Sequence, residues 1–333
     1  MGSYYTNGLV ARSKWARAKR QAPTSKTDPP ATGQPQRSVV ARVSQLWLLR
    51  VAWVSLPLTA GSAAAASVES WSSASRIAAE CLLWLAWAIG LLATWAPRPP
   101  MLTALRAIAP ALLLGAIAAM IDGAPSTAAA IAAVVATAIA AVLASADDIA
   151  IACANAAAYG DEFRYPLRVP PALFLGPLPL ARALVVAGIS APTLLLAEGR
   201  VVVGVPCAVA GAALVLVLGR ALHGLSRRWV VLVPAGLVVV DPLTLSDPVL
   251  FLRERIVALI ASSPGRAPEG AIDLRLGAAL GSLVLRLDEP TEIGRVTRAR
   301  RGVEMVRTAE ICIAAVRRDE LLRHATARRL RVG

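Results

Sequence analysis

Long apolar stretches separated by short polar connections fill the first two-thirds of the chain. Each stretch is near the length of roughly 20 residues that crosses the hydrocarbon core of a bilayer as an α-helix. The pattern therefore predicts a membrane α-helical bundle of about six transmembrane helices over residues 44–221. The spans are expected at about 44–66, 78–96, 101–121, 127–146, within 172–197, and 201–219.

Prolines interrupt the pattern before the fifth span. Four of them lie within residues 169–180. Proline removes a backbone donor that lipid does not replace. We therefore expect an interfacial or re-entrant segment there, followed by a spanning helix from near Leu180. The pattern alone leaves open whether residues 169–180 span the membrane, re-enter it or lie on its surface.

The composition supports a membrane protein. Hydrophobic residues make up 56% of the chain and charged residues only 17%, which argues against a purely water-soluble protein. The net charge of +14 would suit a nucleic-acid partner. However, arginines beside apolar spans are explained by the positive-inside bias of membrane proteins, so we expect no nucleic-acid partner. Abundant alanine, and arginine in great excess over lysine, indicate a GC-rich bacterial genome.

The placement of basic residues predicts the orientation. Residues 1–43 are basic and have a Pro-rich middle, which is typical of a disordered tail. If this tail is cytoplasmic, arginines favour the inner connections. Six spans then return the chain to the cytoplasm, so both termini are expected on the inner side of a bacterial plasma membrane. The inner connections contain Arg98, Arg106, Arg164, Arg168 and Arg182, and the outer ones Arg76 and Arg200.

The chain becomes too polar to span a membrane after Gly224. Residues 222–333 are predicted to form one cytoplasmic α+β domain, β-rich with a terminal helix. Acidic residues begin and arginines end the segment 319–329, as a helix dipole prefers. Strands are expected at 229–233, 237–240, 271–276, 282–288 and 310–316, whereas 248–261 fits a helix or a strand.

One resemblance arises from this order of elements. The run from Arg228 to Pro242, with its Pro234-Ala235-Gly236 turn, precedes further strands and one terminal helix. This region resembles the bacterial pleckstrin-homology-like (PH-like) domains that follow membrane helices. The whole layout is similar to actinobacterial multi-spanning membrane proteins of unknown activity. The resemblance implies a fold and a location, and it implies no reaction.

Two groups in the membrane half are candidate polar sites. Asp147, Asp148, Asp161 and Glu162 gather on one predicted inner connection. Four carboxylates there would suit a hard divalent ion or a proton relay. The alternative is that they are solvated charges beside neighbouring arginines. Arg182 is the second candidate, because the prolines around it favour a water-lined cavity.

Signatures of catalysis are missing from the sequence. The chain contains no GxSxG, GxxxxGK[ST], GxGxxG or HExxH motif. Its four cysteines are far apart and it has two histidines, so no zinc-site spacing occurs. We therefore assign no catalytic residue, metal or cofactor.

The C-terminal domain contains the candidate lipid-binding site. Arg295, Arg298, Arg300 and Arg301 cluster in one predicted loop. Held near the inner leaflet, such a cluster would attract anionic lipids. Alternatively, these arginines pair with Glu292 and Glu304. Membrane lipids and other membrane or envelope proteins are the expected partners.

Two classes of function remain. The first is a membrane scaffold or regulatory binding protein that uses the cytoplasmic domain for interaction. The second is a transporter, or a transporter subunit, that the soluble domain regulates. Transporters commonly have broken helices and ionisable groups at the membrane midplane. The predicted spans have their polar groups near their ends, which favours the scaffold.

Overall fold

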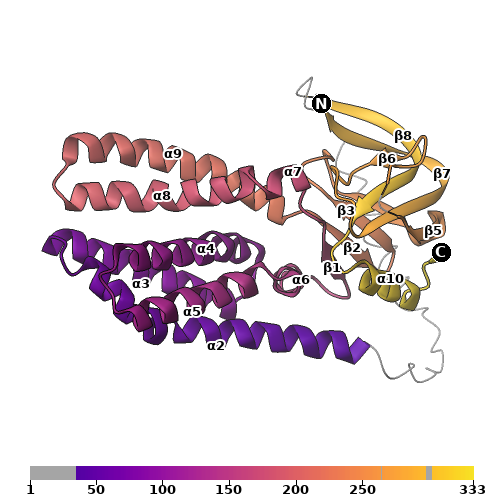
Figure 1. Ribbon diagram of the computed structural model, residues 1–333. Helices are drawn as coiled ribbons and strands as arrows, with labels where there is room; N and C mark the ends of the chain where they lie inside the picture. Colours follow the sequence, from indigo (N-terminus) through magenta and orange to yellow (C-terminus); the bar gives the residue numbers. More distant parts are fainter. Residues whose placement is uncertain (1–34, 264, 298–301) are drawn as a thin grey trace, which may run out of the picture. The chain divides into compact units, whose positions relative to one another are not determined.

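Six long apolar helices dominate the first part of the protein in a computed structural model (Figure 1). The structure describes residues 35–263, 265–297 and 302–333, with side chains described from Ser44 onward. By length and composition, six of its helices are able to cross a membrane, which confirms the expected bundle of spans. They are α2 (Pro35–Val68), α3 (Ser73–Trp95), α4 (Pro99–Asp122), α5 (Thr127–Ser145), α8 (Pro177–Ala197) and α9 (Val201–Ser226).

Two helix boundaries differ from the sequence-based expectation. Helix α2 begins at Pro35, inside the segment 1–43 that the composition predicts to be a tail, and residues 1–34 lie outside the described part. Proline suits a first turn, where its missing N–H has no partner to lose. The proline-rich segment 169–180 contains the short helix α7 (Pro171–Phe174) and the start of α8 at Pro177. The helix around Leu180 thus begins slightly earlier than expected.

Helices α2 and α3 are joined by a reciprocal pair of tryptophans. The indole N–H of Trp53 donates to the Trp87 carbonyl at 2.9 Å, and that of Trp87 donates to the Trp53 carbonyl at 3.0 Å. The Trp53 ring is fully buried and lies over Gly90. A Cβ at Gly90 would be 1.9 Å from Trp53 Cζ2. Glycine is therefore required at this position for the two helices to approach.

Two four-stranded sheets and the terminal helix α10 make up most of the other described residues. The first sheet has the order β1-β2-β3-β4, and the second has the order β5-β7-β8-β6. Neighbouring strands are antiparallel except β6 and β8, which are parallel. The expected β-rich region with a terminal helix is confirmed. The elements are β1 (Phe163–Pro166), β2 (Trp229–Val233), β3 (Gly236–Val240), β4 (Val249–Leu252), β5 (Ile256–Ala261), β6 (Ile272–Asp273), β7 (Ser282–Thr297), β8 (Gly302–Ala314) and α10 (Arg318–Ala327).

The ambiguous segment 248–261 is extended. It forms β4, a single 3-10 turn over Arg253–Arg255, and β5. Pairing of β4 with β3 and of β5 with β7 supplies hydrogen-bond partners that the local pattern does not reveal. Tertiary pairing therefore decides between helix and strand here.

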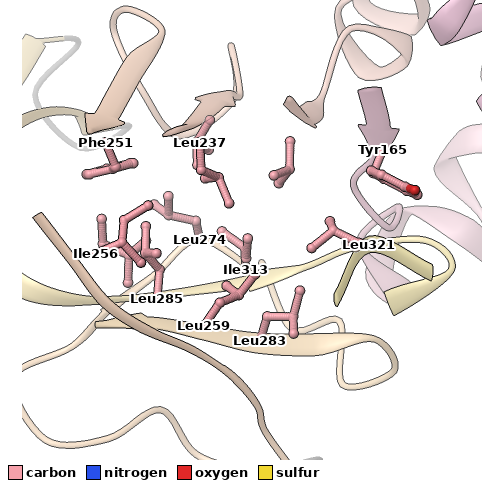
Figure 2. Packing of buried hydrophobic residues seen from close by; sticks show 14 of the residues in the cluster. Tyr165, Leu237, Phe251, Ile256, Leu259, Leu274, Leu283, Leu285, Ile313 and Leu321 are labelled. Carbon is pink, nitrogen blue, oxygen red and sulfur yellow. The ribbon is translucent and has the colours of Figure 1, made fainter. Parts of the chain in front are cut away.

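Strand β1 comes from outside the expected domain 222–333. It lies in the connection between α6 (Asp147–Asn155) and α7, and it pairs antiparallel with β2. Strand β1 and residues 229–333 together are called the β region. The core of the β region contains buried side chains from both sheets and from α10. Figure 2 shows this packing, with Tyr165 of β1 and Leu321 of α10 among the residues.

Candidate functional site

The segment immediately after β1 joins the two sheets. The backbone N–H of Leu167 donates to the Arg228 carbonyl at 2.9 Å, on the side of β2. The next N–H, from Arg168, donates to the Ala314 carbonyl at 2.8 Å, at the end of β8. In return, the N–H of Val316 donates to the Pro166 carbonyl at 2.9 Å. The segment that connects α6 to α7 is thus an integral part of the β region.

A buried ion pair lies at the same junction. Arg228 follows α9, and its Nε and Nη2 atoms each donate to an Asp241 oxygen at 2.8 Å. Their side chains are 1% and 0% exposed. Arg228 Nη1 also donates to the Arg168 carbonyl at 3.0 Å. Both charges are compensated by the two-point geometry that an arginine and a carboxylate prefer. This pair fixes the end of α9 to β3 and to the β1 segment.

The carboxylates Asp147 and Asp148 form two separate ion pairs. Asp148 is only 5% exposed and accepts from Arg317 Nη2 at 2.6 Å. Asp147 lies 3.7 Å from Arg168 Nη1. The interpretation of Asp148 as a solvated charge is therefore wrong. The sequence hides this pair, because Arg317 is far away along the chain and adopts a left-handed backbone conformation with φ of 52°.

Asp161 and Glu162 pair with two other arginines. Asp161 Oδ1 accepts from Arg328 Nη2 at 2.7 Å, and Glu162 Oε1 accepts from Arg164 Nη2 at 2.6 Å. The four carboxylates thus form four different ion pairs. In the described part of the chain, no group of three or more His, Cys, Asp or Glu residues is placed to hold a metal ion.

Burial favours the neutral form of two thiols, those of Cys153 and Cys312. Burial raises the pKa of Cys153 to about 12, although the charge of Arg106 acts in the opposite direction. Burial also raises the pKa of Cys312, again against a nearby arginine charge, that of Arg275. A nucleophilic cysteine needs a lowered pKa and access to solvent. Neither thiol satisfies both conditions.

A hollow of about 760 Å³ lies in the connections around β6. Asp273 and Arg275 line it, and the Arg275 guanidinium also bonds to Ser282 Oγ and the Gly265 carbonyl. Burial alone would raise the pKa of Asp273, but hydrogen bonds from Arg275 outweigh it and hold that pKa below its ordinary value. The charged groups thus bind one another and stabilise the connections around β6.

One face of the first sheet is apolar and only partly covered. Trp229 and Val231 of β2 pack beneath Ala154 of α6. Farther along the same face, Leu250 and Leu252 of edge strand β4 are 47% and 46% exposed. Sequence reasoning missed this surface. The available signal was that β3 and β4 are apolar at almost every position, whereas a strand with one solvated face alternates.

The predicted arginine sites are only partly described. Arg295 is on β7 and lies opposite Glu304 of β8, while Arg298, Arg300 and Arg301 lie outside the described residues. Arg182 is on α8, five residues after Pro177, and is half-buried.

Comparison with family models, with curated proteins and with solved structures finds no match to this chain.

Proposed function

We propose that this protein is a membrane scaffold or regulatory binding protein. Its six apolar helices anchor the β region at the inner face of a bacterial plasma membrane. The β region then binds a protein partner through the outer face of β3 and β4. The observation that carries this proposal is the exposure of Leu250 and Leu252 on an edge strand.

An exposed apolar edge strand is costly unless something covers it. Leu250 and Leu252 are adjacent to the partly exposed Val238 across the strand pair. Edge strands present unpaired backbone groups as well, and an extended segment of another protein can add to them as a further strand. Main-chain hydrogen bonds would supply affinity, and the two leucines would select apolar side chains.

The attachment of the β region to the helices α6 and α9 also suits a scaffold. The buried pair of Arg228 and Asp241 lies directly after α9, and the pair of Asp148 and Arg317 connects α6 to the segment before α10. Strand β1 adds a third link. A binding surface that is held at several points loses little conformational entropy when a partner docks.

The order of elements supports a PH-like fold for the β region. Four antiparallel strands form one sheet, β5, β7 and β8 form an antiparallel second sheet, and α10 ends the chain. The core lies between these elements. Two features depart from a self-contained domain, because β6 adds a short parallel strand and β1 is contributed by the membrane half.

Two buried threonines in the spans favour the scaffold over the transporter. Thr94 Oγ1 donates to the Leu91 carbonyl, and Thr137 Oγ1 donates to the Ala133 carbonyl. Both bonds are local to one helix. Groups satisfied in this way need no substrate or coupling ion to compensate them.

The orientation is part of the proposal and has a direct test. Because β1 pairs with β2, Gly160 and Gly224 should lie on the same side of the membrane. Alkaline phosphatase is active only outside the cytoplasm, so fusions near these two glycines should be inactive and fusions near Ala124 and Glu198 active. Opposite activities at Gly160 and Gly224 would refute the pairing, and a fully reversed pattern would refute the orientation.

The partner surface is tested by affinity purification of the full chain in mild detergent. We expect proteins that co-purify with the native chain to be lost from the variant carrying Leu250→Ser and Leu252→Ser. The matched control is Leu280→Ser, which changes another exposed leucine of the β region, one that is 68% exposed. Equal co-purification with all three forms would refute the proposed surface.

A further inference from the structure

Glu80 places a carboxylate well inside the apolar helix α3. The sequence pattern predicts a span from about residue 78, but the helix begins at Ser73. Glu80 is therefore seven residues inside the helix, about 10 Å along its axis. Trp71 precedes α3 and Trp95 ends it, and the two are 42% and 57% exposed. Indole rings mark membrane interfaces in this way, so Glu80 lies about a third of the way across the span.

No described residue compensates the charge of Glu80. Its side chain is exposed, and none of the ion pairs in the described part of the chain includes it. By contrast, Arg50 of α2 donates to the Thr94 carbonyl at 3.1 Å, and Arg106 of α4 donates to the Ala144 carbonyl at 3.4 Å. A charged side chain that faces hydrocarbon is costly and marks a functional surface.

Three exposed neighbours extend the surface around Glu80. Arg76 lies one turn before it and is exposed, and Ile77 and Trp84 are 58% and 57% exposed. At 100° per residue, these four side chains share a stripe about 100° wide on α3. Ala79, which is 8% exposed, lies outside the stripe on the buried side of the helix. Arg76, Ile77, Glu80 and Trp84 are called the Glu80 face.

The Glu80 face is complementary to itself. It has one cation and one carboxylate, and these do not pair within the helix. A twofold dimer brings the same surface of both copies together. With both copies inserted in the same direction, Arg76 of one copy lies about 6 Å along the axis from Glu80 of the other, which an arginine side chain can span. The symmetry gives two such ion pairs, with Ile77 and Trp84 packed beside them.

We infer that two copies of this chain form a dimer through the Glu80 face, in which Arg76 of each copy pairs with Glu80 of the other. The dimer removes both charges from lipid. Polar side chains that bond across helices stabilise helix association in membranes. The charge complementarity selects a second copy over an apolar partner helix, which would leave Glu80 uncompensated. This inference rests on the proposed membrane anchoring of the apolar helices and is independent of the proposed surface on β3 and β4.

The test is co-expression of two full-length copies that carry different tags. Purification through one tag in mild detergent should recover the other tag, and light scattering should give the mass of two chains. Glu80→Leu should weaken the dimer about tenfold for each of the two pairs, and thus about a hundredfold. The matched control is Glu69→Leu, which removes an exposed carboxylate just before α3, and it should behave like the native chain.

Exchanged charges separate pairing between copies from pairing within one helix. Arg76→Glu gives one copy two acids on the Glu80 face, and Glu80→Arg gives the other copy two bases. Neither variant should pair with itself, because like charges meet across the twofold axis. The two variants expressed together should pair with each other. Pairing within one helix would give no such rescue.

Three outcomes would overturn the inference. The first is a native chain that is monomeric, with no recovery of the second tag. The second is equal recovery for the native chain and Glu80→Leu. The third is a different membrane protein that co-purifies with the native chain and is lost from Glu80→Leu, while native copies do not pair. That result would show that the other protein covers this face.

Extraction of the membranes with alkaline carbonate distinguishes failure of the dimer from failure of the anchor. Release of the native chain would refute the membrane anchoring in the proposed function. A native chain that is retained but monomeric would refute the dimer alone. If Glu80→Arg does not insert, the comparison of the native chain with Glu80→Leu still decides.

Discussion

Removal of Asp241 should destabilise the junction between α9 and the β region more than any surface charge change. In Asp241→Ala, the guanidinium of Arg228 loses two hydrogen bonds of 2.8 Å. Because Arg228 is 2% exposed, water does not replace the lost carboxylate. Only its bonds to the Arg168 and Leu274 carbonyls remain. The variant thus retains a buried cation without a counter-charge.

The size of this effect is set by the burial of the pair. Breaking a buried ion pair by removing one partner typically costs about 3–5 kcal/mol, because the remaining charge stays desolvated. At about 2–4 °C per kcal/mol for a chain of a few hundred residues, the Tm should fall by roughly 6–20 °C. Replacement of both charges by apolar residues, as in Arg228→Met with Asp241→Leu, should recover most of this loss.

The assay is thermal unfolding of the full chain in detergent, monitored by circular dichroism. Glu310→Gln is the matched control, because it weakens the exposed pair with Arg286, which is 50% exposed at its side chain. Exposed pairs contribute only about 0–1 kcal/mol. A Tm for Asp241→Ala equal to that of the control would refute the reasoning about burial.

Three further predictions concern packing, thiol chemistry and domain integrity. Gly90→Ala should destabilise the chain by about 1–3 kcal/mol by Tm, because a Cβ would overlap Trp53, whereas Gly115→Ala, with nothing within 4 Å, should not. Cys153 and Cys312 should resist maleimide at neutral pH and react after denaturation; rapid native labelling would contradict their burial. The fragment 222–333 lacks β1, the partner of β2, and should show no cooperative melt; a cooperative melt would show that β1 is dispensable.

The local sequence pattern predicts those elements whose stabilising contacts lie within a few residues along the chain. The apolar helices can be predicted from the sequence because each one alone has the length and composition to cross a membrane. Helix α10 is readable from Asp319 and Glu320 in its first turn. The hairpin of β2 and β3 is readable from two apolar runs around a turn, Pro234-Ala235-Gly236. In each case the signal and the stabilising contacts lie within a few residues.

Elements that depend on partners far along the chain cannot be predicted from the local sequence pattern. The four residues of β1 form a strand because they pair with β2, and nothing in the sequence Phe-Arg-Tyr-Pro demands it. The local sequence suggests a solvated Asp148 because its partner Arg317 is remote along the chain. The same limit applies to the candidate sites. The carboxylates on one connection separate into different pairs because their arginines come from different elements.

The position of β1 also constrains how the protein assembles. Strand β1 is synthesised before α8 and α9, and its partner β2 is synthesised after them. If both helices cross the membrane, they return the chain to the side on which β1 lies. The first sheet then forms only after this helical pair has inserted, because a strand on the wrong side has no partner. Long-range pairing of this kind is slow and leaves apolar edges exposed in the meantime.

Helices α8 and α9 pack closely at Gly188 and Gly211. An added Cβ at Gly211 would be 2.2 Å from the Gly188 oxygen. This close packing favours insertion of the two helices as one hairpin. A bulky residue at Gly211 should therefore impair the β region, although it lies within an apolar helix.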